Sequence, residues 1–326
     1  MTRYVVITSI FSPSEAVKNY ADINNLKVIV IGDKKTPYGW SCDGVSFFGL
    51  DEQSNSGYKI AKLLQYDHYS RKMIGYIIAR EEGAQSIVDT DDDNVPLIGW
   101  HFPPYSADYE LISGNLGFIN VYQLFTDQII WPRGLPLRVI NEARPFENSN
   151  PIRRCNVGIW QGLADEDPDV DAIYRLTSDK PCYFKKRDPI VLGRKTFSPF
   201  NSQNTLFRKE LFPLLYLPTS VSFRFTDILR GLVAQPIMWE EGYLLGFLEA
   251  TVVQHRNPHN YMEDFQSEIP MYINCDKAVE LVDAAVSSNR GCCDNLYEAY
   301  ESLLRGGIVK EIELATLEAW LSDITR

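Results

Sequence analysis

The sequence predicts an α/β fold in which a mostly parallel sheet is flanked by helices, with a helical extension at the C-terminus. Three apolar, β-branched runs, at residues 4–10, 27–33 and 86–89, have the composition of buried strands. Segments with helical character separate these runs, and the alternation of strand and helix is typical of parallel sheets covered by helices. The 326 residues suffice for one large domain or two smaller ones.

Each later element carries its own local signal. Residues 13–15, Pro-Ser-Glu, have the chemistry of a helix start between the first two strands. A long helical stretch at about residues 67–82 ends near Gly83, just before the third strand. Residues from about 95 to 220 are rich in Pro, Asn and aromatic side chains and predict short strands. Apolar residues return at helical spacing after about residue 276, so we expect a main domain over 1–275 and a helical extension over 276–326.

The composition narrows the possible partners and location. A net charge of −11 repels nucleic acid and anionic membranes, so an anionic substrate would need a local basic patch or a metal ion. The six cysteines include no CxxC pair, which indicates free thiols rather than a zinc cage. No apolar run approaches the ~20 residues of a membrane span, and the N-terminus does not resemble a signal peptide. We therefore expect a cytoplasmic protein, soluble or peripherally membrane-associated, without nucleic-acid partners.

A run of four carboxylates follows the third predicted strand. Asp89, Asp91, Asp92 and Asp93 lie within five positions, and such close carboxylates repel unless a cation shares the site. A solvated acidic turn is the simplest alternative, because Asp favours turns. Ligands of open α/β sheets bind beyond the carboxyl ends of the strands, so the run should meet the ends of the other two strands there. The polar residues at those two ends are Thr8, Ser9, Asp33 and Lys34.

The spacing within the run rules out an EF-hand loop and disfavours an aspartyl phosphotransferase. An EF-hand loop starting at Asp89 would need Gly and Glu where the chain has Asn94 and Trp100. A phosphotransferase with an aspartyl nucleophile would carry a hydroxyl residue at the position of Asp93. Asp89-Thr90-Asp91 instead fits the Asp-x-Asp pattern of enzymes that use nucleotide sugars. There Asp89 and Thr90 would contact the nucleotide sugar, and Asp89 and Asp91 would hold Mn²⁺ or Mg²⁺ bridging two phosphates.

Several motifs occur together, in this order, and resemble the STELLO family of glycosyltransferases. They are YSRKMIGY (69–76), EEGAQSIVDTDDDN (81–94), WPRGLPL (131–137), NSQNTLF (201–207), DILRGLVAQPIMWE (227–240) and QHRN (254–257). The resemblance covers roughly residues 3–270 and implies a GT-A fold, with a nucleotide-sugar half over about 1–130 and an acceptor half over about 131–275. The plant members carry a membrane anchor and further sequence, so their Golgi location and link to cellulose synthesis are not expected to carry over.

The resemblance implies an enzyme that moves a hexosyl or pentosyl unit from a nucleoside diphosphate sugar to a carbohydrate or other hydroxyl acceptor. We expect UDP as the nucleotide and inversion at the transferred carbon. A sugar-nucleotide mutase, like the reversibly glycosylated polypeptides, is the alternative among enzymes. A catalytically silent scaffold or binding protein is the alternative from another class, although crowded like charges disfavour it.

The motifs supply further candidate residues. Arg71 and Lys72 precede the acidic strand, and at most one should face the phosphates because neighbours on a helix point about 100° apart. His255 is the expected third metal ligand, with His259 as a second histidine nearby.

Asp227 stands directly before a helical run, where it is either the catalytic base or an N-cap. Glu240 and Glu241 are the reserve candidates for the base. The expected sugar or acceptor contacts are Trp131, Arg133, Asn204 and Trp239. Core packing is the alternative for both tryptophans, although an aromatic face can also pack against a pyranose ring.

Overall fold

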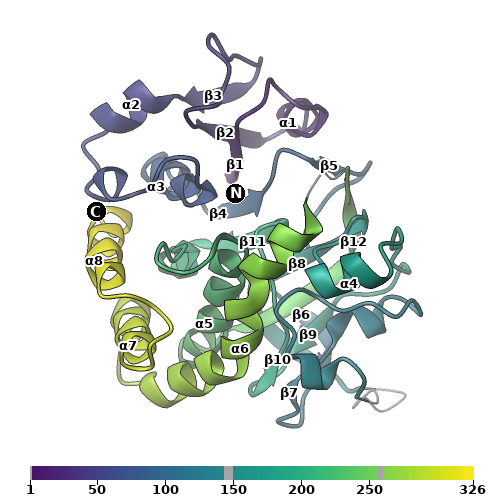
Figure 1. Ribbon diagram of the computed structural model, residues 1–326. Helices are drawn as coiled ribbons and strands as arrows, with labels where there is room; N and C mark the ends of the chain where they lie inside the picture. Colours follow the sequence, from purple (N-terminus) through teal and green to yellow (C-terminus); the bar gives the residue numbers. More distant parts are fainter. Residues whose placement is uncertain (1, 143–149, 256–259) are drawn as a thin grey trace.

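The computed structural model describes residues 2–142, 150–255 and 260–326. In these ranges ten strands form one sheet in the order β3-β2-β1-β4-β11-β8-β6-β9-β12-β5, and helices pack on its faces (Figure 1). The α/β class predicted from the sequence is therefore confirmed. Two hydrophobic clusters lie on opposite faces, because alternate residues of β1 join different clusters: Val6 packs with Ile74, and Val5 packs with Val17.

The first half of the sheet is parallel throughout. Its strands are β1 (Arg3–Ser9), β2 (Leu26–Gly32), β3 (Val45–Phe48) and β4 (Ser86–Thr90). The register pairs Val6 with both Ile29 and Asp89, so β1, β2 and β4 end at one edge of the sheet. The three predicted strands thus form where the sequence indicates, and the acidic run follows the end of β4.

The second half of the sheet is mixed. Its strands are β5 (Asn94–Pro96), β6 (Ser106–Ile112), β8 (Ile152–Glu166), β9 (Ile190–Leu192), β11 (Asn204–Arg208) and β12 (Leu244–Gln254). β11 runs antiparallel to both β4 and β8 and joins the two halves. β8 pairs with β6 at its start and with β12 over its remainder. A separate parallel pair consists of β7 (Gly117–Phe118) and β10 (Thr196–Phe197).

Helices cover both faces of this sheet. They are α1 (Glu15–Ala21), α2 (Leu50–Asn55), α3 (Lys72–Glu81), α4 (Ala172–Thr177) and α5 (Thr226–Glu240). Ser14 caps α1 by accepting the Val17 N–H at 3.2 Å. α3 follows a 3₁₀ turn over Tyr69–Arg71 and lies close on β1, since a Cβ at Gly75 would stand 2.5 Å from Val6. This close packing brings the start of α3 to the end of β4.

Three C-terminal helices complete the fold: α6 (Tyr261–Ala285), α7 (Cys292–Arg305) and α8 (Ile312–Ile324). Their apolar side chains belong to the same hydrophobic cluster as α3 and α5, with Tyr300, Leu317 and Trp320 fully buried. Residue 276, where the sequence suggested a boundary, lies inside α6, and the division into two units stays a prediction. Among the described residues, no helix combines the length and apolar character needed to cross a membrane.

Candidate active site

Two adjoining cavities lie where β1, β2 and β4 end. The larger, of about 360 Å³, is called the carboxylate cavity because Asp91, Asp92, Asp93, Asp169 and Asp227 line it. The smaller, of about 180 Å³, is called the strand-end cavity and is lined by Ile31, Gly32 and Asp33 at the end of β2. The residues that line both are Thr8, Ile10, Phe11, Tyr69, Asp92 and Phe223. The two cavities therefore form one continuous site.

Asp89 is neutralised inside the protein. Its side chain is fully buried, with Lys72 Nζ at 2.9 Å from Oδ1 and an Arg230 guanidinium nitrogen at 2.6 Å from Oδ2. Burial opposes ionisation, but Lys72 and Arg230 outweigh it and hold the pKa of Asp89 below its ordinary value. Thr90 is also buried and donates its hydroxyl to the Gln203 carbonyl at 2.6 Å. Neither Asp89 nor Thr90 is among the described residues that line the two cavities.

Asp91 is the member of the Asp-x-Asp pattern that faces the carboxylate cavity. Its side chain is 40% exposed, and Lys72 Nζ lies 2.8 Å from its Oδ1. The surrounding protein removes water from the Asp91 carboxylate at the base of the cavity, and this desolvation is the largest cause that raises its pKa to about 6, with Lys72 opposing the shift and Asp89 adding to it. Lys72 thus bridges the two carboxylates, and it also donates to the Thr90 carbonyl at 2.7 Å. The predicted crowding is real, and its shared cation is a lysine.

The rest of the acidic run is tied to neighbouring strands. Asp92 accepts a hydrogen bond from the Ser9 hydroxyl at the end of β1. Asp93 accepts from the Gln254 side-chain amide at 3.0 Å, and its carbonyl accepts the His255 N–H at 3.2 Å. The run is therefore an ordered wall of the site rather than a solvated turn.

The strand-end cavity collects four of the eight residues that the sequence suggested for nucleotide binding. Thr8, Ser9, Asp33 and Arg71 all line it, whereas Lys35 rather than Lys34 reaches it. Lys34 instead places its ammonium 4.4 Å from the centre of the Tyr66 ring.

Two buried contacts shape this cavity. Arg71 donates from Nε to the Gln53 side-chain oxygen at 2.8 Å, and Gln53 in turn donates to the Gly32 carbonyl at 2.8 Å.

His68 also lines the strand-end cavity. Burial lowers the pKa of His68 to about 4, so this ring is neutral at neutral pH. Its Nδ1 accepts the Ser70 N–H at 3.1 Å and so begins the 3₁₀ turn before α3.

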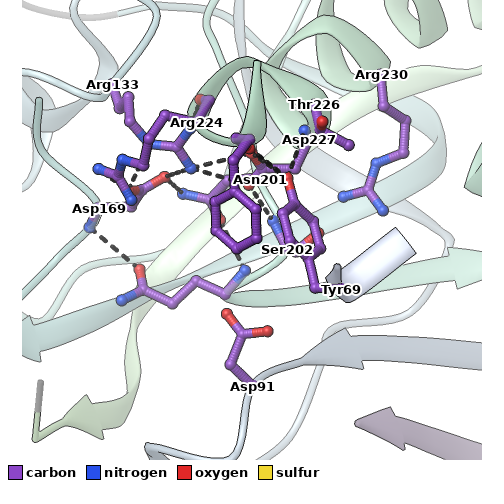
Figure 2. Close-up of polar contacts among 12 residues, drawn as sticks. Tyr69, Asp91, Arg133, Asp169, Asn201, Ser202, Arg224, Thr226, Asp227 and Arg230 are labelled. Atoms are coloured by element: carbon purple, nitrogen blue, oxygen red, sulfur yellow. Dashed lines mark hydrogen bonds and ion pairs between the residues drawn. The ribbon is translucent and has the colours of Figure 1, made fainter. Parts of the chain in front are cut away.

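Asp227 lies in the first turn of α5 and faces the carboxylate cavity. Arg133 donates to both of its oxygens, at 3.0 and 2.9 Å, and the Ser202 N–H donates to Oδ2 at 3.2 Å. Figure 2 shows this group together, with the carboxylate of Asp91 pointing toward it. The N-cap of α5 is Phe225, without a side-chain hydrogen bond, so the capping interpretation of Asp227 is wrong.

Asp169 is a central residue of the site that the sequence reasoning missed. It accepts from Arg133 Nε at 2.8 Å and from a terminal nitrogen of Arg133 at 2.7 Å, and the Asn201 amide adds a bond at 2.8 Å. Arg133 is therefore buried between Asp169 and Asp227. The segment DEDPDVD (165–171) carries the same crowding of carboxylates after a strand as the first acidic run, and that signal was available.

Five other candidates lie away from the two cavities. Glu240 and Glu241 lie at the C-terminal end of α5, whereas Asp227 lies in its first turn. At a rise of 1.5 Å per residue, the two ends are about 20 Å apart. Glu240 forms an ion pair with Arg194. Trp239 packs edge-on against Phe197 in the core. The other two are also core residues: Trp131 donates to Asp171 at 2.7 Å, and Asn204 donates to Thr251 at 2.8 Å. Core packing therefore accounts for both tryptophans, and the reserve bases are out of reach.

His255 is exposed at the edge of the acidic wall, the name used here for the carboxylates of Asp91, Asp92 and Asp93. Its Nδ1 lies 3.3 Å from a Glu166 oxygen, and it lines a further cavity of about 240 Å³ together with Asp92 and Asp93. His259 lies outside the described residues.

The acidic run, residues 89–93, offers carboxylate oxygens, which are the kind of donor that Mg²⁺ and Mn²⁺ take. Within the described ranges no group of three or more His, Cys, Asp and Glu side chains is placed to enclose an ion. Mg²⁺ in phosphate-handling sites is usually held by only one or two carboxylates, and the substrate phosphates and water complete its coordination. Asp91 and Asp93, both on the carboxylate cavity, are donors of this kind.

Comparisons with known proteins agree with the motifs. A family model described as STELLO glycosyltransferases matches residues 224–326. Two curated proteins of Arabidopsis thaliana, "Probable glycosyltransferase STELLO2" and "Probable glycosyltransferase STELLO1", are each 29% identical to the chain over 346 aligned positions. Each alignment includes 99% of this chain and 44% of the relative, so the chain spans less than half the length of these relatives. The resemblance seen in the sequence is thereby confirmed: the chain is STELLO-like over nearly its whole length.

Proposed function

We propose that the chain is a metal-dependent glycosyltransferase that uses a nucleoside diphosphate sugar, with UDP as the first nucleotide to test and inversion as the expected outcome. The observation that carries this proposal is the pairing of two cavities at one edge of the sheet. The strand-end cavity is walled by the ends of β1 and β2. In the carboxylate cavity, Asp91 lies across from Asp227. Both "probable glycosyltransferase" names among the relatives agree with it.

In this proposal the strand-end cavity holds the nucleoside. Asp33 presents a carboxylate that already accepts the N–H groups of Lys34 and His68, at 2.7 and 3.3 Å, which fixes its orientation. A carboxylate held in this way can accept hydrogen bonds from ribose hydroxyls or from a base N–H. Phe11 and Phe223 add apolar surface against which a base can lie.

The acidic wall then holds the metal. Asp91 and Asp93, on the carboxylate cavity, would be the protein ligands of Mn²⁺ or Mg²⁺, and His255, which lines a neighbouring cavity with Asp93, is the candidate third. The ion, when bound, offsets the negative charge of the departing nucleoside diphosphate. Lys72 and Arg230 supply two positive charges beneath this wall, so Asp89 adds no net repulsion to the diphosphate.

Asp227 is the proposed base that takes the proton of the acceptor hydroxyl. A carboxylate has about four acceptor positions. One N–H of a terminal Arg133 nitrogen is shared between the two oxygens of Asp227, because the other N–H of that nitrogen donates to Asp169, and the Ser202 N–H donates to Oδ2. The Tyr69 hydroxyl lies 3.3 Å from Oδ1 but only 3.1 Å from the Phe223 carbonyl, and its single proton can satisfy one of them. Donation to the carbonyl leaves a position on Oδ1 for the acceptor.

A thermal-shift screen of nucleoside diphosphates, with and without Mn²⁺, tests the proposed function. A ligand present at a hundredfold excess over Kd stabilises the native state by about 2.7 kcal/mol. We expect a shift with UDP and Mn²⁺ together that is larger than with UDP alone. No response to any nucleotide, with or without metal, would contradict the proposal and favour a scaffold.

A further inference from the structure

Gln53 is a buried residue that holds Arg71 at the strand-end cavity. Its side-chain NH₂ donates to two backbone carbonyls, those of Gly32 at 2.8 Å and Phe48 at 2.9 Å. These two bonds fix the direction of the amide, so its oxygen faces Arg71. Arg71 donates to that oxygen from Nε at 2.8 Å and also from a terminal nitrogen. One neutral amide thus sets the position of a cation that lines the cavity.

The hydrogen bonds of Arg71 all go to neutral oxygens. Besides Gln53, its acceptor in the described part of the chain is the Leu64 carbonyl at 3.4 Å, so three of its five guanidinium N–H groups are used. Arg71 is buried, and among the described residues it forms no ion pair with a carboxylate. Burial lowers the pKa of Arg71, and the nearby Asp33 carboxylate offsets this effect only in part.

Lys34 places a second positive charge next to Arg71. The Arg71 guanidinium lies 4.6 Å from the centre of the Tyr66 ring, and the Lys34 ammonium lies 4.4 Å from the centre of the same ring. Lys35 and Asp67, which both line the strand-end cavity, lie 3.9 Å apart and offset each other's charge. A buried cation is costly unless an anion pairs with it, so this arrangement points to an anionic group supplied by a ligand.

We propose that Gln53 is a positioning residue that keeps the charge of Arg71 free for the phosphate next to the ribose of a bound nucleotide. The inference rests on the proposed function, in which the strand-end cavity holds the nucleoside, and it names the pair of residues that binds the first phosphate. That phosphate is the one nearest the cavity, and the two remaining guanidinium N–H groups are donors suited to its oxygens. Lys72 does not compete for this part, because its three N–H groups already go to two aspartates and the Thr90 carbonyl.

Binding of UMP and of uridine to the wild type, without metal, tests the inference. The two ligands differ only in the phosphate, and without Mn²⁺ only the cations of the protein can bind it. We expect calorimetric titration to give a Kd for UMP at least about tenfold below that for uridine, a difference of 1.4 kcal/mol. UMP binding no tighter than that of uridine, or no binding of UMP, would overturn the inference.

Gln53→Glu attributes the preference for UMP to this pair. Its carboxylate would form a buried ion pair with Arg71 and compete with the phosphate, so we expect the preference to fall to about threefold or less. Arg71→Met removes the charge, keeps a long side chain and should have the same effect. Gln85→Glu is the matched control. It adds the same charge directly before the start of β4, at the opposite edge of the sheet from the site, and should leave the preference unchanged.

The outcomes separate this inference from the proposed function. If UDP fails to bind with and without Mn²⁺, the proposed function fails and the inference fails with it. If UDP binds with Mn²⁺ but UMP and uridine bind the wild type equally well, the inference alone is overturned. A purely structural role of Gln53 would weaken both ligands by the same factor in Gln53→Glu, which also overturns it. The wild-type ratio and Arg71→Met decide the question even if Gln53→Glu, which cannot donate to the Gly32 and Phe48 carbonyls, does not fold.

Discussion

At the level of single residues, the acidic edge of the sheet is neutralised from beneath by Lys72 and Arg230. Lys72 contacts Asp89 and Asp91 at 2.9 and 2.8 Å, and Arg230 contacts Asp89 at 2.6 Å. Removing one partner of such a buried pair leaves an uncompensated charge, which typically costs 3–5 kcal/mol. Asp89 therefore organises the site, whereas Asp91 is the carboxylate placed to meet a ligand.

Asp227→Asn separates chemistry from binding at the proposed base. The amide keeps the size of the side chain and loses its basicity, so we expect transfer to fall at least about a hundredfold with donor affinity unchanged. Arg133 keeps Asp169 as a partner, so the fold should survive with a stability loss of about 1–3 kcal/mol. The measurement is the rate of sugar transfer beside calorimetric donor binding. A transfer rate near that of the wild type would exclude Asp227 as the base.

His68 gives a prediction about pH. Its folded pKa of about 4 lies below the ordinary value of 6.5, so the unfolded chain binds the proton more readily. The contribution of neutral His68 to stability is therefore fully present above pH 6.5 and is lost as the pH falls toward 4. His68→Asn keeps an acceptor for the Ser70 N–H but cannot titrate.

Urea unfolding of the wild type and of His68→Asn at several pH values tests whether the stability contributed by neutral His68 is lost at low pH. We expect the free energy of unfolding of the variant to rise relative to the wild type by about 2 kcal/mol between pH 6.5 and pH 4. The comparison between the two proteins cancels the titration of other groups. A difference that stays constant over this range would contradict the burial of a neutral ring.

At the level of elements, α8 holds the segment that brings Phe223 and Arg224 to the carboxylate cavity. The buried carboxylate of Glu313 accepts the N–H groups of Thr219 and Ser220, at 2.9 and 2.7 Å, and the hydroxyl of Tyr216. Phe223 lies three residues after Ser220 and packs edge-on against Tyr69, with 4.7 Å between the ring centres. A C-terminal helix thus supports one wall of the site.

Glu313→Ala should therefore destabilise the protein. It leaves two backbone amides and a hydroxyl without their acceptor, at about 1–3 kcal/mol for each group that stays unsatisfied. Because Thr219 and Ser220 are partly exposed, water offsets part of this loss, and we expect about 2–4 kcal/mol by urea unfolding. Glu311→Ala, on an exposed neighbour, is the control and should stay within about 0.5 kcal/mol. Equal stability of the two variants would show that the carboxylate does not anchor the segment.

Apolar runs and helix-end residues in the sequence predicted the first strands of the sheet and the end of α3. β1, β2 and β4 each contain an apolar run, and α3 ends at Glu81, two residues before Gly83, whose φ is +85°. The antiparallel insertion of β11 between β4 and β8 had no such signal, because it depends on pairing Thr205 with residues far away in the chain. Asp91 and Asp227 were found from motif position. Arg230, 141 residues from Asp89, could not be assigned to it without the fold.

At the level of the whole molecule, the C-terminal helices share the main hydrophobic cluster with the sheet. Trp320 packs near Tyr76 of α3, and Asp323 accepts the Ile60 N–H at 2.9 Å. The sequence showed only that the tail is helical and apolar on one side. The contacts that join it to the first half connect residues more than 240 positions apart, which periodicity cannot reveal.

Calorimetric unfolding should consequently show one transition. A tail that shares its core with the sheet cannot unfold alone without exposing Trp320 and Leu317 together with α3. We expect the calorimetric and van't Hoff enthalpies to agree within error. A separate low-temperature transition of the size expected for about 50 residues would contradict this and support an independent C-terminal unit.

The central claim is that the acidic edge binds a nucleoside diphosphate through a metal on Asp91. The most direct measurement is calorimetric titration of UDP, in the presence of Mn²⁺, into the wild type, Asp91→Asn and Asp108→Asn. Asp108 is an exposed aspartate of β6, so its variant controls for the change in net charge. We predict that the wild type and Asp108→Asn bind UDP equally and that Asp91→Asn binds at least about tenfold more weakly, a difference of 1.4 kcal/mol. Equal affinity in all three proteins, or no binding by the wild type, would contradict the claim.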